Sequence, residues 1–244
     1  MIRVVVVDDE PMVCAHLRVI LGAADDLEVV GEAQDGAEAV EAVVRHRPDV
    51  VLMDLRMPGV DGLVAIERIG ALPAPPAVVA LTTFDADGYV LRALRAGAAG
   101  FLLKSTPPED LVGLVRVAAA GHTVLSPAAA ARLVAATAAG RGRDEARARL
   151  RGLSDRDRDV LACLGRGLSN AGIARELHLS EATVKSYVSR MLVKIDCRNR
   201  TQAGLLAHEA GLVTGSWSPG RSRPLLPTPL GRARRTGDLT RGGE

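Results

Sequence analysis

Five short apolar runs, each followed by an amphipathic stretch, occupy the first half of the chain and constrain its fold more than any other feature. The first run, Ile2–Val7, is rich in β-branched residues, which suits a parallel strand that is buried on both faces. Strands that alternate with helices form a parallel sheet covered on both sides. We therefore predict an α/β domain over residues 1–120, with a five-stranded, parallel, doubly wound sheet. The predicted strands are Ile2–Val7, Leu27–Gly31, Asp49–Met53, Ala77–Thr82 and Ala99–Leu103, and the predicted helices are Pro11–Leu21, Gly36–His46, Gly62–Leu72, Ala86–Ala96 and Pro107–Ala120.

The rest of the chain follows a different pattern. Residues 121–152 combine an Ala-rich stretch with a stretch rich in Arg and Gly, and we interpret them as a linker. From residue 153 short helical patterns follow one another, which predicts a small all-α domain over residues 153–213. Residues 214–244 are rich in Gly, Pro, Ser and Arg, which predicts a disordered basic tail. The predicted helices of the all-α domain are Asp155–Leu164, Asn170–Leu177, Glu181–Ile195 and Arg200–Ala210.

Charge is divided unequally between the two halves. Residues 1–125 hold 10 basic and 18 acidic residues, whereas residues 126–244 hold 21 basic and 11 acidic ones. This asymmetry indicates that the basic half binds a polyanion, although a solvated Arg-rich surface is an alternative explanation. Aromatic residues make up only 2% of the chain, which argues against stacking platforms for single-stranded nucleic acid. The three separated cysteines exclude a disulfide framework. No apolar run approaches the length of a membrane span, so we expect no membrane segment or signal peptide, and a cytoplasmic location.

Polar side chains follow four of the five predicted strands. Asp8 and Asp9 follow the first strand, Asp54 follows the third, Thr82 ends the fourth and Lys104 follows the fifth. Ligands bind beyond the carboxyl ends of the strands in such sheets. A cluster of carboxylates is a suitable binding site for Mg²⁺. A carboxylate beside this ion can act as a nucleophile toward phosphorus. A lysine and a hydroxyl can then bind the oxygens of the phosphoryl group. The sequence therefore predicts a metal-assisted phosphorylation site, with strand-end capping as the alternative role of any single residue.

The motifs around these residues resemble the receiver domain of two-component response regulators. They are Val-Asp8-Asp9-Glu10, Met53-Asp54-Leu-Arg-Met57-Pro58-Gly59-Val-Asp61-Gly62, Leu81-Thr82-Thr83-Phe84 and Gly100-Phe101-Leu-Leu-Lys104. The resemblance implies that Asp54 accepts a phosphoryl group from the phosphohistidine of a sensor histidine kinase. It also implies that Asp9, Asp54 and the backbone carbonyl of Arg56 bind Mg²⁺ directly, that Asp8 acts through water, that Lys104 pairs with the phosphate, and that Thr82 and Phe101 form the switch.

The basic half contains two predicted helices, Asn170–Leu177 and Glu181–Ile195, separated by three residues. This is the spacing of a helix-turn-helix. The second helix carries an apolar stripe and, on its other faces, basic and hydroxyl side chains that suit a DNA major groove. An ordinary helical bundle with a solvated face is the alternative. The polar residues of the second helix are Thr183, Lys185, Ser186, Ser189, Arg190 and Lys194.

This half resembles the LuxR-type DNA-binding domain. The resemblance rests on Leu153-Ser154-Asp-Arg156-Asp157-Arg-Asp-Val160-Leu161, Gly167-Leu-Ser169-Asn170-Ala-Gly-Ile173-Ala174-Arg-Glu-Leu177, Ser180-Glu-Ala-Thr183-Val184-Lys185 and Ile195-Asp-Cys-Arg-Asn-Arg200-Thr-Gln202-Ala203. It implies that Lys185, Ser186 and Ser189 face base edges, that Thr183, Lys194 and the helix start at Asn170 meet phosphates, and that the last helix forms a dimer surface. Joined to a receiver, this is the layout of the NarL/FixJ family.

The two resemblances together predict a transcription factor that is switched by phosphorylation and is not an enzyme. The expected partners are a sensor histidine kinase, double-stranded DNA with an inverted-repeat site and, after phosphorylation, a second copy of the chain; RNA polymerase is a further candidate. Two alternatives remain open. One is a regulator that does not depend on phosphorylation and uses the receiver only to dimerise. The other is a Mg²⁺-dependent aspartyl-phosphate phosphatase. Arg56 argues against it, because such enzymes carry a second aspartate two residues after the nucleophile.

Overall fold

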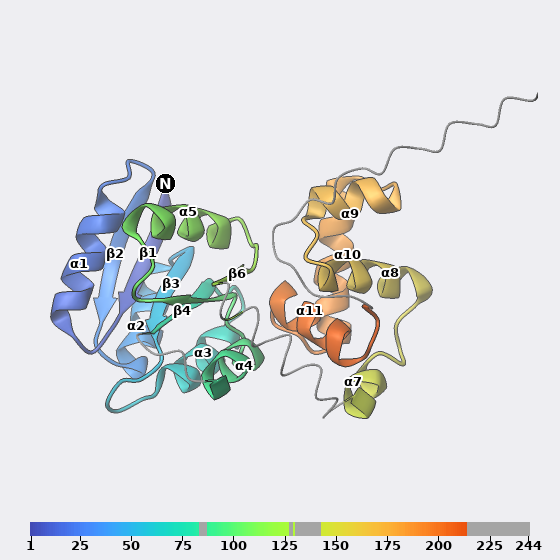
Figure 1. Ribbon diagram of the computed structural model, residues 1–244, viewed down its shortest axis with the longest axis horizontal. Helices are drawn as coiled ribbons and strands as arrows, with labels where there is room; N and C mark the ends of the chain where they lie inside the picture. The colour runs from blue at the N-terminus through green and yellow to red at the C-terminus, as the bar shows by residue number, and fades with distance from the viewer. Residues whose placement is uncertain (83–86, 127–128, 130–142, 214–244) are drawn as a thin grey trace, which may run out of the picture.

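The computed structural model describes residues 1–82, 87–126, 129 and 143–213, and it places an α/β domain beside an all-α domain (Figure 1). The predicted tail, residues 214–244, and residues 127–128 and 130–142 of the predicted linker lie outside the described residues. Of the receiver-like motifs, Thr83 and Phe84 lie outside them as well.

The α/β domain is built on one parallel sheet with the strand order β2-β1-β3-β4-β5-β6. The five predicted strands are confirmed. The sixth strand is a correction, because it lies in the segment that the sequence indicated as linker. It is only two residues long, too short to show a periodicity, and it forms by pairing with the edge of β5. The strands are β1 Ile2–Val7, β2 Leu27–Ala33, β3 Val50–Asp54, β4 Ala77–Thr82, β5 Gly100–Leu103 and β6 Val124–Leu125.

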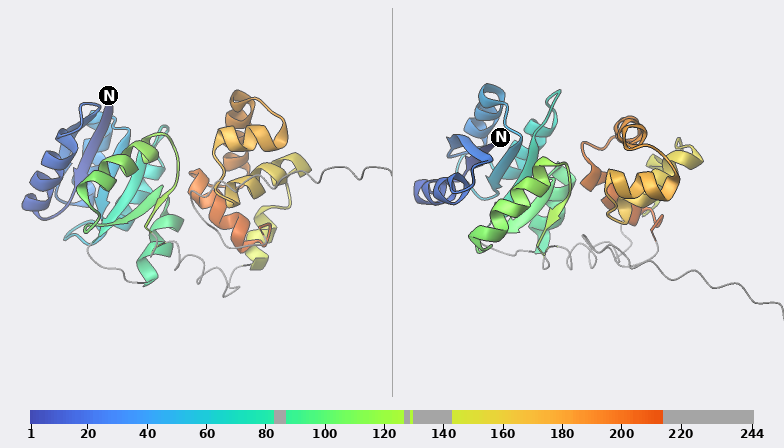
Figure 2. Two further views of the ribbon diagram at one scale, coloured as in Figure 1. Left: turned by 45° about the horizontal axis from the view of Figure 1, so that its top comes forward. Right: turned by 90° about the horizontal axis from the view of Figure 1, so that it is seen from above.

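Helices cover both faces of the sheet, as the alternating pattern predicts. On one face, α1 and α5 bury Leu21 and Val115 against the strands. On the other face, α2, α3 and α4 bury Val43, Ile66 and Leu94. Figure 2 shows the sheet between these two layers. The helices of this domain are α1 Pro11–Gly22, α2 Gly36–His46, α3 Gly62–Gly70, α4 Asp87–Ala96 and α5 Pro108–Ala119.

The all-α domain has its own core, with Leu161, Ile173 and Met191 almost fully buried. The four predicted helices are confirmed, and each begins at a side chain that caps its first turn: Ser154, Ser169, Ser180 and Asn199. An additional helix, α7, occupies part of the predicted linker and contributes Ala146 to this core. This helix was not predicted, because the high Arg and Gly content of the segment makes its amphipathic spacing hard to recognise. The helices are α7 Arg143–Arg149, α8 Asp155–Gly165, α9 Asn170–Leu177, α10 Glu181–Lys194 and α11 Arg200–Glu209.

The two domains meet at α11. Leu205 of this helix is buried with the apolar residues that α3 and α4 cover. Side chains around the start of α11 also donate hydrogen bonds to backbone carbonyls at the end of α4 and in the loop before β5. The bonds to Arg95, Ala96 and Gly97 satisfy carbonyls at the end of α4, where the helix offers no further N–H partner. They are Arg198 to Ala96 at 2.9 Å, Asn199 to Gly97 at 2.6 Å, Thr201 to Ala99 at 3.2 Å and Gln202 to Arg95 at 2.7 Å.

Candidate functional site

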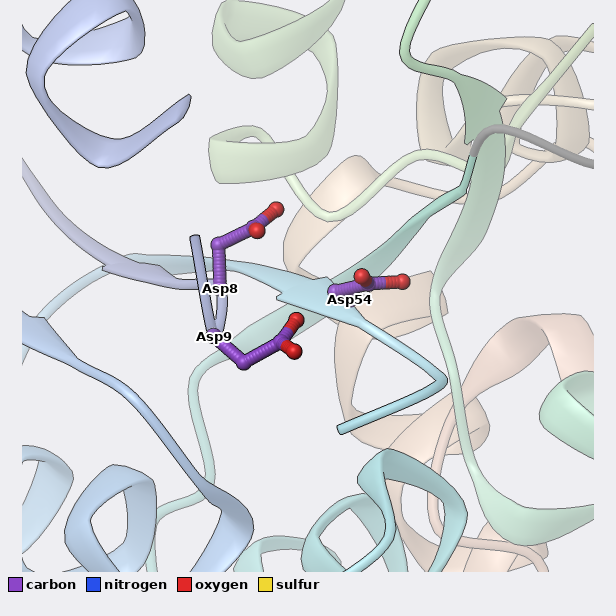
Figure 3. A group of neighbouring side chains, drawn as sticks. All are labelled: Asp8, Asp9 and Asp54. Carbon is purple, nitrogen blue, oxygen red and sulfur yellow. The ribbon is translucent and has the colours of Figure 1, made fainter. Parts of the chain in front are cut away.

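Three carboxylates converge at the carboxyl edge of the sheet, as predicted from the strand ends (Figure 3). Asp8 and Asp9 follow β1, and Asp54 is the last residue of β3. Each offers an oxygen, and these oxygens lie within 4.8 Å of one another. Asp8 and Asp54 are buried, whereas Asp9 is half-buried. A set of three carboxylate oxygens on a partly open edge fits a hard divalent cation that keeps some of its water.

Lys104 joins two of these carboxylates. Its Nζ lies 2.6 Å from Oδ2 of Asp8 and 3.0 Å from Oδ2 of Asp54. The backbone N–H of Lys104 also donates to the carbonyl of Thr82, so the end of β5 is fixed against the end of β4. The predicted lysine therefore lies beside the predicted phosphoacceptor, and its side chain is only 11% exposed.

The chain around Asp54 holds its carboxylate in a defined orientation. Oδ1 accepts hydrogen bonds from the backbone N–H of Leu55 at 2.6 Å and of Arg56 at 3.3 Å. The start of α3 then passes so close that a Cβ on Gly62 would lie 2.2 Å from the carbonyl oxygen of Asp54. Asp61 caps that helix by accepting from the N–H of Leu63 at 2.7 Å. Only glycine fits at position 62, because the backbone itself occupies the space.

Burial and charge act against each other in this pocket. Burial raises the pKa of Asp8 above its ordinary value, although hydrogen bonds from Lys104 and from the N–H of Glu10 oppose the shift. Burial alone would lower the pKa of Lys104, but its hydrogen bonds to Asp8 and Asp54 outweigh burial and raise it. The lysine is thus a stable cation between two carboxylates. Such a pocket attracts further positive charge and can hold the oxygens of a phosphoryl group.

The two predicted switch residues lie on adjacent strands. Thr82 ends β4 and is buried, with 4% of its surface exposed. Phe101 lies on β5 opposite Ala80, and its ring is fully buried among residues that pack against α3 and α4. The ring therefore points into the core in this structure.

The residues predicted to bind DNA lie on α10 and at the start of α9. Ser180 caps α10 by accepting from the N–H of Thr183 at 3.1 Å. Lys185, Ser186 and Ser189 are exposed. The hydroxyl of Ser186 donates to the carbonyl of Ala182 at 3.2 Å within the same helix. The helix thus presents a lysine and small polar side chains on its outer side.

Two predicted phosphate contacts have partners inside the domain. Nζ of Lys194 lies 2.8 Å from Oδ2 of Asp157 in the first turn of α8. Oδ1 of Asn170 lies 3.5 Å from the guanidinium of Arg200, which also donates to the carbonyl of Leu168. Neither intramolecular partner is visible in the one-dimensional spacing of the motifs.

The outer side of α10 is turned partly toward the receiver-like domain. Lys185 and Ser189 line a cavity of about 570 Å³ together with His122 and Asp49 of the α/β domain. The residues that form the contact between the two domains were not identified from the sequence. Their only signal was the capping pattern Asn199-x-x-Gln202 at the start of α11, which predicts a helix start and does not indicate a partner domain.

Family models match both domains. The response regulator receiver domain matches residues 4–116, and the luxR family of bacterial regulatory proteins matches residues 151–207. Among the described residues, no helix combines the length and apolar character that crossing a membrane requires.

Curated relatives match nearly the whole layout. The uncharacterized transcriptional regulatory protein YxjL of Bacillus subtilis is 38% identical over 212 residues, which cover 87% of this chain and 97% of that protein. The nitrate/nitrite response regulator protein NarL of Escherichia coli is 35% identical and covers 84% of this chain and 94% of that protein. A crystal structure of a LuxR-family two-component response regulator from Aurantimonas is 32% identical, with a TM-score of 0.52, over 54% of this chain and 94% of that one. The chain therefore belongs to the NarL family of response regulators, with a receiver domain followed by a LuxR-type helix-turn-helix domain.

Proposed function

We propose that this response regulator is a transcription factor that is switched when a sensor histidine kinase transfers a phosphoryl group to Asp54. The observation that carries the proposal is the arrangement of Asp54 between Asp9 and Lys104 at the carboxyl edge of the sheet. A carboxylate oxygen of Asp54 attacks the phosphorus, and the bond from phosphorus to the donor's imidazole nitrogen breaks. The acceptor is then an aspartyl phosphate, whose oxygens the ammonium of Lys104 and the hydroxyl of Thr82 would hold.

The chain's own residues account for most of the chemistry. The N–H groups of Leu55 and Arg56 hold Oδ1 of Asp54 in place, which leaves the Oδ2 side toward Lys104. Asp9, Asp54 and the carbonyl of Arg56 would hold Mg²⁺ directly and Asp8 would hold it through water; when bound, this ion would supply positive charge that offsets the charge of the incoming group. Arg56 occupies the position where the related phosphatases carry a second aspartate, so no general acid for rapid turnover stands there. We infer a phosphorylated regulator in preference to an enzyme.

The contact between the domains supports a switch. Lys185 and Ser189, which we propose to face base edges, line a cavity between the two domains, and receiver residues such as Asp49 and His122 form part of its wall. DNA and the receiver therefore compete for one side of α10. Phosphorylation that moves Thr82 and Phe101 would shift the balance toward a separated form, through the strands that lead to this contact. The separated form would dimerise through α11 and bind an inverted repeat in double-stranded DNA, where it could meet RNA polymerase. Since the proposed partners include DNA, we propose a cytoplasmic location.

The test is phosphorylation by acetyl phosphate with Mg²⁺, followed by mass measurement of the intact chain. We expect one phosphoryl adduct in the wild type and none in Asp54→Asn. The exposed Asp25 offers a matched control, since Asp25→Asn removes the same charge away from the pocket and should leave the adduct unchanged. A full adduct in Asp54→Asn would overturn the assignment. The same samples are then incubated with random-sequence duplexes, and equal enrichment by the two forms would overturn the switch.

A further inference from the structure

The last residue of α10, Lys194, forms an ion pair with a residue in the first turn of α8. Its ammonium lies 2.8 Å from Oδ2 of Asp157, and the aspartate side chain is only 6% exposed whereas the lysine side chain is 51% exposed. The sequence motif alone suggested a DNA phosphate as the partner of this lysine. The structure instead gives it a buried carboxylate in the same domain.

Asp157 is itself part of the start of α8. Its N–H donates to the hydroxyl oxygen of Ser154 at 3.2 Å, and its Oδ2 accepts from the N–H of Ser154 at 3.3 Å, which together form a capping box. The hydrogen bond from Lys194, with a smaller contribution from Ser154, holds the pKa of Asp157 below its ordinary value. The carboxylate is therefore ionised, buried and partnered by one ammonium. Removing that ammonium would leave a buried charge without its counter-ion.

The position of Lys194 on α10 separates it from Lys185, which we propose to face base edges. Lys185 and Lys194 are nine residues apart, which is about two and a half turns at 3.6 residues per turn. They therefore point to opposite sides of the helix. The same end of α10 is held by a second cation, because Arg149 of α7 donates to the carbonyls of Ile195 and Asp196.

We propose that Lys194 is a positioning residue, which fixes the recognition helix on α8 through Asp157 and does not bind a DNA phosphate. This inference rests on the proposed DNA-binding function of α10. The bond fixes the far end of the helix, while the Ser180 cap fixes the near end. The orientation of α10 then follows from α8, so the base-reading residues enter the groove at one angle.

The test compares Lys194→Met, Asp157→Asn and the double variant in the full chain. The probes are a duplex enriched from a random pool by the wild type and a mixed-sequence duplex, each titrated at several salt concentrations. We expect Lys194→Met to lower the melting temperature and to reduce the preference for the enriched duplex about tenfold. The salt dependence on the mixed duplex should stay the same. Asp157→Asn should reproduce these effects, and the double variant should be no worse than the worse single one.

A phosphate contact would give the opposite pattern. Lys194→Met would then lower the salt slope by about 0.9 on both duplexes without a change in melting temperature, and Asp157→Asn would leave the preference intact; either result overturns the proposal. Lys185→Met is the matched control on the same helix, and it should reduce the preference with no change in melting temperature. If Lys194→Met does not fold, the melting temperature and duplex preference of Asp157→Asn alone decide whether the proposal holds. A wild type that enriches no duplex would refute the proposed function, whereas the melting temperatures would still report the Lys194–Asp157 coupling.

Discussion

Arg198, just before α11, donates from Nη1 to the carbonyl of Ala96 at the end of α4, over 2.9 Å, and so joins the helix-turn-helix domain to the receiver. The side chain lies in a slot between two glycines. A Cβ on Gly70 would lie 2.8 Å from Cδ of Arg198, and one on Gly97 would lie 3.4 Å from the same atom. The contact thus depends on the absence of side chains at the ends of α3 and α4.

Removing this contact should release α10 without phosphorylation. A hydrogen bond from a charged donor contributes about 1.5–3 kcal/mol, and the exposure of Arg198 reduces that value toward about 1 kcal/mol. Arg198→Ala should therefore raise the DNA affinity of the unphosphorylated protein about fivefold. The measurement is DNA titration together with the radius of gyration from small-angle scattering. Arg151→Ala removes an exposed arginine elsewhere and should lower affinity or leave it unchanged. No gain in affinity for Arg198→Ala would show that the contact does not restrain α10.

Thr82 should couple phosphorylation to DNA binding without being needed for phosphate uptake. Thr82 ends β4, where its backbone carbonyl accepts from the N–H of Lys104, but the attacking carboxylate belongs to β3. Thr82→Ala should accept phosphate with the wild-type stoichiometry and lose most of the increase in DNA affinity. Thr82→Ser restores the hydroxyl and should recover the increase. A Thr82→Ala protein with the full increase would exclude Thr82 from the switch.

Gly62 should be required for the phosphoacceptor loop. Gly62→Ala forces a Cβ against the carbonyl of Asp54, and overpacking of this kind costs about 1–3 kcal/mol. We expect a lower free energy of unfolding in urea and slower phosphorylation by acetyl phosphate. Gly113→Ala is the control, because a Cβ there meets no atom within 4 Å and lies within α5. Replacing a helical glycine by alanine should stabilise the protein by about 0.5–1 kcal/mol. Equal effects of the two variants would contradict the close approach.

The arrangement of the two domains should weaken at acidic pH. Burial, and then the charge of Arg200, hold the pKa of His122 below its ordinary value. Because this pKa is lowered, His122 binds a proton more tightly when the domains are apart or unfolded than when they are in contact. Its contribution to the stability of the domain contact is therefore complete above a pH of about 6.5. That contribution is lost as the pH falls through the pKa of His122 in the folded protein. The radius of gyration should rise between about pH 8 and pH 5.5 in the wild type. His122→Gln should remove this rise, and an unchanged rise in that variant would show that His122 does not control the domain contact.

The sequence predicted the residues of the pocket well, because the carboxyl ends of all strands in a parallel sheet lie at the same edge. Asp8, Asp54 and Lys104 come from three strands, yet their place is determined once the strands are recognised. The partners of Lys194 and Arg198 could not be predicted in this way. Their bonds depend on how α8 packs against α10 and how α11 packs against α4, and neither packing leaves a periodicity in the sequence. The short strand β6 escaped prediction for a related reason, since it exists only through its neighbour β5.

The phosphoacceptor and the domain contact lie at opposite edges of one sheet. Asp54 and Lys104 are at the carboxyl ends of the strands, whereas Ala96, Gly97 and His122 precede β5 and β6 at the amino ends. The six residues of β4 span about 20 Å between these edges. In the proposed function, a kinase therefore reaches Asp54 at the edge away from the domain contact, while α10 still faces the receiver. We therefore expect that Asp54 can be phosphorylated before the domains separate, so that phosphorylated molecules whose domains are still in contact are populated.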